Sequence, residues 1–427
     1  MLINKINSIT NFKSNVTFDI GGSQSEGSCK IYYSSSKNED LYKERTTVND
    51  LGKTKFESND DFIDLIVNKI KNLQKNGEEI IAEKGYPAKE NTIKNVAIFL
   101  PSYTSKNYAF YLPNHRNINN KPLKDLSFRK LKEKLEAKGV KVAPDFKLKV
   151  LQDALGTGCA MAKKLYDMGK LETGSYYTAC ITGGGCGVSN IRYYDDNNII
   201  ISSSGSAYLS QSLNSQKVSK VGASAPAVIV NFCKALGLNE EETEDIRACN
   251  KAEFTMTEAT TYPKDVKTEL LKQCLLNTDK FEIAHEDEKE FTIKIKNGYK
   301  ALFDRARRNA IDKYCLAFAR LAAIKKNEGS NGLIITGPLA KSIDHAAKIN
   351  YGIGISEWVT GHLAQSFNSY ELEKMQKVYG FKVFCDDRFF IDDNTECKEL
   401  VHVAEAVNEK RGNWLKLSAN KLKNAKL

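Results

Sequence analysis

The sequence predicts an α/β fold built from two domains. Strand and helix patterns alternate along the chain, and 427 residues are more than one small core usually holds. Continuous apolar runs such as "NVAIFLPSY" are typical of strands buried within a sheet. We expect a first domain over residues 1–148 and a second over 149–427.

The first domain opens with two expected strands, at 16–20 and 29–33. An amphipathic helix is expected over 61–73, because the apolar residues of "DFIDLIVNKIKNL" recur at helical spacing. A buried strand follows at 95–103, and the polar stretch "YLPNHRNINNKPLKDL" is interpreted as a loop that leads into a helix. The last helix of the chain is expected to pack on this domain.

The second domain begins with a helix rich in small residues, "ALGTGCAMAKKLYDMG". A strand–glycine–strand unit at 176–194 and a helix at 225–237 come next, followed by a charge-rich insertion at about 240–297. A long helix over 299–326 places its apolar residues near one face. It leads into "NGLIITGPLAKSID", which predicts a strand, a turn and a helix.

Composition and charge narrow the possible function. The net charge is +10, but the lysines are scattered among acidic residues, which favours a generic basic surface over a nucleic-acid site. No stretch suits a membrane span or a signal peptide, so we expect a cytoplasmic protein without a membrane partner. The ten cysteines lack C-x-x-C spacing and lie in apolar segments, which predicts reduced core thiols and no structural zinc.

Three glycine turns each follow an apolar strand: "FDIGGSQ" at 18–24, "ITGGGCG" at 181–187 and "IITGPL" at 334–339. Glycine lets backbone N–H groups approach an anion closely, because no Cβ intervenes. A single turn of this kind can be an ordinary hairpin, whereas three favour phosphate binding. Neither the Walker A spacing nor the G-x-G-x-x-G spacing occurs in these turns.

The order of these motifs resembles that of the ROK family of sugar kinases, within the superfamily of actin, hexokinase and the heat-shock ATPases. The resemblance follows most of the chain except about 240–297. It implies a two-lobed, actin-like ATPase fold of the ribonuclease-H-like type, with a cleft between the lobes. It also implies an ATP-dependent phosphotransferase of the hexokinase or glucokinase type, active in carbohydrate metabolism such as glycolysis. The expected acceptor is the 6-hydroxyl of glucose or a related hexose. Relatives are commonly dimers, so a homodimer is one expectation.

The resemblance also implies roles for individual residues. Asp19 would lie near Mg²⁺, through water, and Asp153 would be the general base. Asn114 and Gln152, together with Asp153, would contact the sugar. The residues implied to bind ATP and its phosphates are Gly21, Gly22, Ser23, Gly183, Gly184, Gly185, Gly187, Gly337 and Pro338.

Simpler interpretations exist for two of these residues. Asp153 precedes a helix and would also serve as its N-cap, and Asn114 would also suit an ordinary loop. The physical chemistry of the transfer nevertheless agrees with the implied roles. A carboxylate must accept the proton of the attacking alcohol, and Mg²⁺ prefers one or two carboxylates plus water.

The sequence departs from the family on the sugar side. The zinc motif is absent, and no glutamate lies between Glu172 and Glu240, where the family has sugar-binding acids. The replacing loop, "SSSGSAYLSQSLNSQ", offers other hydrogen-bonding groups, namely Ser206, Ser210, Gln211 and Asn214. The sequence therefore leaves the acceptor open. A non-catalytic sugar or nucleotide sensor with a degenerate kinase fold is the alternative, and an actin-like filament protein is a third possibility. The presence of Asp153 favours catalysis over both.

Overall fold

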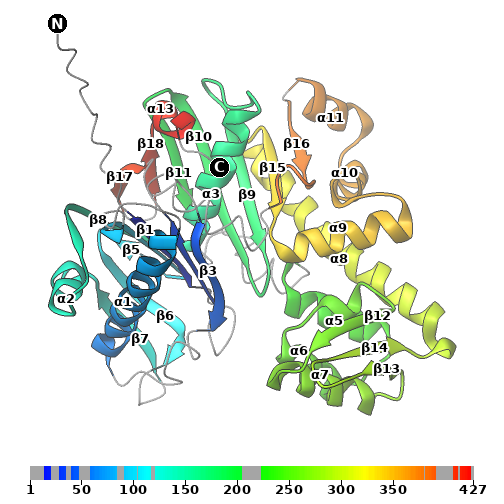
Figure 1. The fold of residues 1–427 in the computed structure, drawn as a ribbon. Coiled ribbons are helices and arrows are strands. Elements are labelled where there is room, and N and C mark those ends of the chain that lie inside the picture. The colour runs from blue at the N-terminus through cyan, green and yellow to red at the C-terminus, as the bar shows by residue number, and fades with distance from the viewer. Residues whose placement is uncertain are drawn as a thin grey trace, which may run out of the picture. The chain divides into compact units, whose positions relative to one another are not determined.

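The structure is a computed structural model that describes residues 14–20, 28–34, 40–47, 58–83, 91–102, 104–116, 121–203, 223–378, 380–390, 407–411 and 414–424. The chain divides into two compact units (Figure 1). The first comprises 1–156, 394–413 and 424–427, and the second comprises 157–393 and 414–423. The division falls inside helix α3 (Asp153–Asp167). The boundary predicted at 148 lies within a strand, β8 (Val142–Gln152), which pairs with the sheet of the first unit along its length.

The first unit is built on a five-stranded sheet in the order β3-β2-β1-β4-β8. Strands β1, β4 and β8 run parallel, while β2 is antiparallel to both β1 and β3. Their bounds are β1 (Ser14–Ile20), β2 (Ser28–Ser34), β3 (Asp40–Thr47) and β4 (Ile93–Leu100). The apolar run predicted as a buried strand is β4, whose last five residues are all buried.

Two helices and a smaller sheet complete the first unit. Helix α1 (Asn59–Glu83) starts with a reciprocal cap, in which Asp61 N–H donates to Ser58 Oγ and Ser58 N–H donates to Asp61 Oδ2. It extends beyond the predicted helix and buries one apolar face in the core of this unit. The remaining elements are β5 (Thr104–Ser105), β6 (Tyr108–Arg116), β7 (Pro122–Ser127) and α2 (Leu131–Ala137).

The second unit is built on a sheet in the order β16-β15-β9-β10-β11-β18. Strands β9, β10 and β11 form an antiparallel meander, and β15 and β16 run parallel to β9. Their bounds are β9 (Tyr176–Thr182), β10 (Cys186–Asp195), β11 (Asn198–Ser203), β15 (Gly332–Thr336), β16 (Lys382–Phe384) and β18 (Trp414–Leu417).

Helix α3 packs closely on this sheet, because a Cβ added at Gly158 would lie 2.6 Å from both Ile201 and Ser189. Outside the insertion, this unit also contains α5 (Ala225–Ala235), α8 (Lys300–Asn327), α9 (Pro338–Tyr351), α10 (Ile355–Ser366) and the short α11 (Ser369–Glu373). None of the described helices combines the length and apolar composition that crossing a membrane requires.

The end of the chain is attached to the second unit through β18, which pairs with β11. Strand β17 (Val407–Arg411) precedes β18 in the chain, and α13 (Ala419–Asn424) follows it. Ala419 donates its backbone N–H to the carbonyl of Asp196 at 2.7 Å. Residues 414–423 accordingly group with the second unit, whereas we expected the last helix on the first domain.

The insertion expected at about 240–297 is a layer of the second unit with its own sheet. Its strands have the order β12-β14-β13, and the bounds are α6 (Glu240–Cys249), β12 (Ala259–Pro263), α7 (Val266–Asn277), β13 (Phe281–Glu286) and β14 (Glu290–Ile295). Phe254 packs edge-to-face on Phe232 of α5 at 5.6 Å, and Phe232 packs on Phe303 of α8 at 5.1 Å. The region therefore shares the core of the second unit.

Candidate functional site

Two of the predicted glycine turns lie against each other in the second unit. Strand β9 ends at Thr182 and the parallel strand β15 ends at Thr336, so the turns that follow leave the same edge of the sheet. Gly337 has a φ of +102°, and a Cβ placed there would lie 2.5 Å from the carbonyl oxygen of Thr182. Only glycine fits this position, because both the backbone conformation and the contact exclude a side chain.

The first residues of α5 lie beside the turn that follows β9. Ala225, the first residue of α5, donates its backbone N–H to the carbonyl of Gly183 at 2.8 Å. Within the turn, Gly183 N–H donates to the Gly185 carbonyl at 3.0 Å. Helix α5 therefore begins at the glycine hairpin, as α9 begins at Gly337.

Buried hydroxyl groups at the ends of β9 and β15 hydrogen-bond to α8, to β15 and to the segment after β16. The Oγ1 of Thr182 lies 2.8 Å from the hydroxyl of Tyr314 on α8 and donates to the Thr336 carbonyl at 3.4 Å. The Oγ1 of Thr336 in turn donates to the carbonyl of Phe389 at 2.8 Å. Burial raises the pKa of Tyr314 well above its usual value, so this hydroxyl stays neutral and keeps its hydrogen bond.

The electrostatics of this place suit an anion. Helices α5 and α9 both begin here, each has a proline at its start, and neither has an acidic residue in its first turn. Helix N-termini carry partial positive charge, although the Ala225 and Ala227 N–H groups of α5 already donate to the Gly183 carbonyl and to Ser224 Oγ. Gly183 and Gly185 have open space around the position of a Cβ, so a ligand can approach this hairpin closely, although the Gly183 N–H and carbonyl are already hydrogen-bonded within the protein. The arrangement fits the phosphates of a nucleotide.

The first unit brings two of the predicted carboxylate positions to one edge of its sheet. Asp19 pairs in register with Phe99 of β4, which pairs in turn with Leu151 of β8. Gln152 ends β8 and Asp153 begins α3. Because β1, β4 and β8 are parallel, Asp19 and Asp153 both lie at the carboxyl edge of this sheet.

Gln152 and Asp153 differ in how their side chains are satisfied. Gln152 is only 6% exposed, and its Oε1 has no hydrogen-bond partner among the described residues. Asp153 is partly buried, and its Oδ1 accepts a hydrogen bond from the backbone N–H of Ala154 at 2.7 Å. This bond comes from the next residue in the chain, whereas an N-cap side chain accepts from the second or third residue after it, so it is not the capping bond of the alternative interpretation.

Several predicted site residues are not described. Gly21, Gly22 and Ser23 lie outside the described residues, as do Ser206, Ser210, Gln211 and Asn214, and the side chains of Asp19 and Asn114 are not described either. The backbone of Asn114 belongs to β6, where the pairing with β7 is irregular between Leu112 and Arg116. The sequence predicted a loop here, because a proline and an asparagine disfavour a regular strand.

Sequence reasoning missed the hydroxyl groups beneath the turns. From the sequence, Tyr314 is one of the residues on the apolar face of the helix at 299–326, and no motif singles out Thr182 or Thr336. A signal was present, since both turns share a Thr-Gly dipeptide, "ITGGG" and "ITGPL". The link to Tyr314 spans 132 residues and leaves no local pattern.

Comparisons with known proteins place this geometry in a wider context. No family model matches the sequence, and no curated protein matches it. A glucokinase from Balamuthia mandrillaris in complex with glucose has a similar structure, with a TM-score of 0.51 and 10% identity over 93% of this chain and 95% of that chain. The fold is one that glucokinase shares. The similarity confirms the predicted fold class, which is an α/β fold of the two-lobed, actin-like type.

Other solved structures match with TM-scores below 0.5. A ROK family glucokinase from Streptomyces griseus, in complex with glucose and AMPPNP, has a TM-score of 0.43 and 10% identity, covering 91% of this chain and 98% of that chain. Hexokinase from Schistosoma mansoni, complexed with glucose, has a TM-score of 0.47 and 10% identity, covering 92% of this chain and 84% of that chain. Our assignment of the fold rests on the first comparison alone.

Proposed function

We propose that this protein is an ATP-dependent sugar kinase that transfers the γ-phosphate of Mg-ATP to a hexose hydroxyl. The observation that carries the proposal is the meeting of the Gly183 hairpin, the Gly337 turn and the first residues of α5 at one edge of a sheet. This arrangement occurs on a fold shared with a glucokinase whose structure contains glucose. The 6-hydroxyl of glucose or of a related hexose is the acceptor we propose.

Each residue in the proposal has a separate task. The backbone of the Gly183 hairpin and the start of α9 stabilise the negative charge of the phosphates, because their N–H groups are fixed before the reaction. Asp153 accepts the proton of the sugar hydroxyl as that oxygen attacks the phosphorus. Asp19 would hold Mg²⁺ through water, and the ion would supply positive charge to neutralise the phosphates.

The buried Gln152 supports a polar substrate beside Asp153. A buried amide oxygen without a partner is costly, and a sugar hydroxyl would satisfy it. A site built in this way rejects compounds that lack the matching hydroxyl. We therefore propose Gln152 and Asn114 as sugar contacts, together with Asp153.

The proposal is tested by measuring ADP release from Mg-ATP across a panel of hexoses and amino sugars. One sugar should stimulate release, and Asp153→Asn should lower kcat by about 10²–10⁴-fold, the usual contribution of a general base. Asp279→Asn is the matched control, because Asp279 is exposed and has the left-handed backbone (φ +58°) that asparagine also adopts. If no sugar stimulates release although ATP binds, the non-catalytic sensor replaces the kinase.

A further inference from the structure

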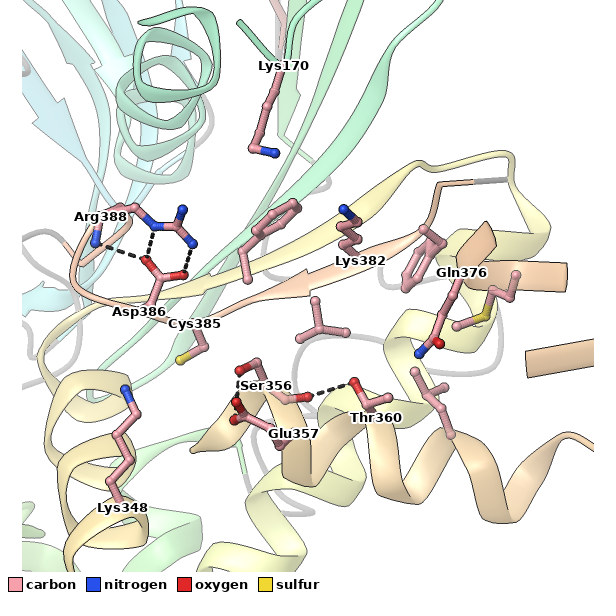
Figure 2. Close-up of a pocket in the computed structure, with 15 residues that line it drawn as sticks. Lys170, Lys348, Ser356, Glu357, Thr360, Gln376, Lys382, Cys385, Asp386 and Arg388 are labelled. Atoms are coloured by element: carbon pink, nitrogen blue, oxygen red, sulfur yellow. Dashed lines mark hydrogen bonds and ion pairs between the residues drawn. The ribbon is translucent and has the colours of Figure 1, made fainter. Parts of the chain in front are cut away.

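A cavity of about 610 Å³ lies in the second unit, beside β16 (Figure 2). Residues from five places line it: the segment before β9, α9, α10, the helical turn Lys374–Val378, and β16 with the residues that flank it. Its volume is that of a site for a small organic molecule. Lys348 lies ten residues after Pro338, which is about 15 Å along α9 from the turn at Gly337.

The floor of the cavity is apolar. Five of its lining side chains are apolar and buried: Leu363, Met375, Phe381, Phe384 and Cys385. A ligand that fills the space would contact these side chains, and close contact with them favours apolar atoms in the ligand through dispersion.

The rim of the cavity carries more positive than negative charge. Four basic residues line it, Lys170, Lys348, Lys382 and Arg388, against two acidic residues, Glu357 and Asp386, an excess of two positive charges.

Two of these bases have acidic partners in the protein. Arg388 binds Asp386 at 2.8 Å, and Lys348 binds Asp344 at 2.6 Å. The ion pairs of the described residues include neither Lys170 nor Lys382. These two ammonium groups can pair with a ligand.

The side chains of the two lysines without such partners, Lys170 and Lys382, lie on the same side of β16. Side chains alternate along a strand, so Lys382 and Phe384 point to the same side. The ammonium of Lys170 lies 5.5 Å from the centre of the Phe384 ring, which brings it to that side too. An aromatic ring with two cationic neighbours is suited to an anion that carries a ring or an alkyl group.

The strand itself adds a backbone donor. Strand β16 is at the edge of its sheet, and the backbone N–H of Lys382 donates inward to the Asn331 carbonyl. Because successive residues of a strand alternate, the N–H of Val383 points to the outer edge of the sheet, and Val383 is one of the lining residues of the cavity. A phosphate or carboxylate at this edge would accept that bond.

We propose that this cavity binds a small organic anion, a phosphate or carboxylate joined to an apolar body. Its charged group lies between Lys170, Lys382 and the Val383 N–H, and its apolar body covers the floor. The site is separate from the glycine turns, and it does not depend on the kinase activity proposed above.

The test is direct binding of phenyl phosphate to the full-length protein by isothermal titration calorimetry, with a saturating, non-hydrolysable ATP analogue present. Phenyl phosphate should bind, and the double variant Lys170→Gln/Lys382→Gln should weaken binding at least about tenfold, since two charge-assisted hydrogen bonds are lost. Lys289→Gln is the control, because Lys289 is exposed on the insertion and lies outside the cavity. The control should leave the affinity unchanged.

Two further probes separate the charged part of the ligand from the apolar part. Benzyl alcohol lacks the charge and inorganic phosphate lacks the apolar body, so each should bind more weakly than phenyl phosphate. Absence of phenyl phosphate binding, an affinity unchanged in the double variant, or equally tight binding of inorganic phosphate would overturn the proposal. Because the readout is binding and not turnover, failure of the proposed kinase activity leaves this result unaffected.

Discussion

Gly183 and Gly337 both lie in turns, but the structure excludes a side chain only at Gly337. At Gly337 the protein itself excludes a Cβ, which would meet the Thr182 backbone at 2.5 Å and 2.9 Å. At Gly183 no atom lies within 4 Å of an added Cβ, and φ is not positive. Substitution at Gly337 therefore tests the fold, and substitution at Gly183 tests a ligand.

Gly183→Ala should leave the midpoint of urea unfolding unchanged and raise the KM for ATP by about tenfold, because a methyl group would separate the backbone from a phosphate. Gly337→Ala should lower the free energy of unfolding by about 1–3 kcal/mol through backbone strain, with a further cost from the contact. Urea unfolding and steady-state kinetics measure both effects. An unchanged KM for ATP in Gly183→Ala would show that this hairpin does not touch phosphate.

Tyr314 is expected to position the turns. Tyr314→Phe removes the hydroxyl that bonds Thr182, so the KM for ATP should rise about 3–10-fold, the value of one hydrogen bond, with a smaller change in kcat. Tyr262→Phe is the matched control, since Tyr262 is also buried and its hydroxyl accepts the Phe254 N–H at 3.0 Å. Both variants should lose similar stability. If both also raise the KM for ATP equally, the hydroxyl of Tyr314 stabilises the fold in general and does not position the turns.

At the scale of elements, local patterns predicted the strands and helices that carry the glycine turns. The run "LIIT" became β15, and Gly337 with Pro338 stopped the strand and started α9 as expected. The course of β6 through Pro113 and Asn114 could not be predicted, because the strand is held by pairs on either side, at Leu112 and Arg116, while these two residues lie in the irregular stretch between them. The sheet of the insertion was missed for a similar reason, since its strands are short and charged on the exposed face.

Helix α1 illustrates an element fixed by one polar side chain. The amide of Gln74 donates to the carbonyls of Asn91 and Lys141 at 2.7 and 2.9 Å, and its Oε1 accepts the Lys141 N–H at 2.8 Å. Gln74 is 6% exposed, so these groups have little access to water. The side chain joins α1 to the residues that precede β4 and β8.

Gln74→Leu should therefore lower the free energy of unfolding by about 2–4 kcal/mol, because the Asn91 carbonyl and the Lys141 N–H lose these bonds, whereas the Lys141 carbonyl still accepts the Ile93 N–H. The exposed neighbour Lys75 provides the control, and Lys75→Leu should change stability by no more than about 0.5 kcal/mol. Urea unfolding measures both. A small effect of Gln74→Leu would mean that water replaces the lost bonds.

At the scale of the whole molecule, the predicted fold class was correct, but the joining of distant parts of the chain was not foreseen. Strand β18 returns from the C-terminal region to pair with β11, and no motif announces it. The sequence did not predict the cavity beside β16 either, because the cavity depends on Lys170 lying near Phe384, more than two hundred residues away in the sequence. Such contacts follow from packing and not from local pattern.

Buried thiols should make the stability of the protein depend on alkaline pH. Burial raises the pKa of Cys233 to about 12, and it also raises the pKa of Cys180, Cys315 and Cys385. An unfolded thiol loses its proton near pH 8.5, whereas the folded one retains it. Above that pH the unfolded state binds fewer protons, so stability present at lower pH is lost as the pH rises.

Each such thiol should lower the free energy of unfolding by about 1.4 kcal/mol per pH unit between about pH 8.5 and 12. Urea unfolding under reducing conditions from pH 8 to pH 10 measures the slope. Cys233→Ala should reduce the slope by the contribution of one thiol, whatever it does to stability at pH 8. An unchanged slope would show that Cys233 ionises as readily in the folded state as in the unfolded one.

The contact between Gly337 and Thr182 has a consequence for selection. In a library randomised at codons 183 and 337, a screen for folded protein alone would already restrict position 337 to glycine. The same screen would accept many residues at position 183, and only a screen for turnover would remove them. A glycine that is always recovered at position 337 therefore gives no information about substrate binding. A glycine that is recovered at position 183 only in the screen for turnover would show that this position is needed for catalysis.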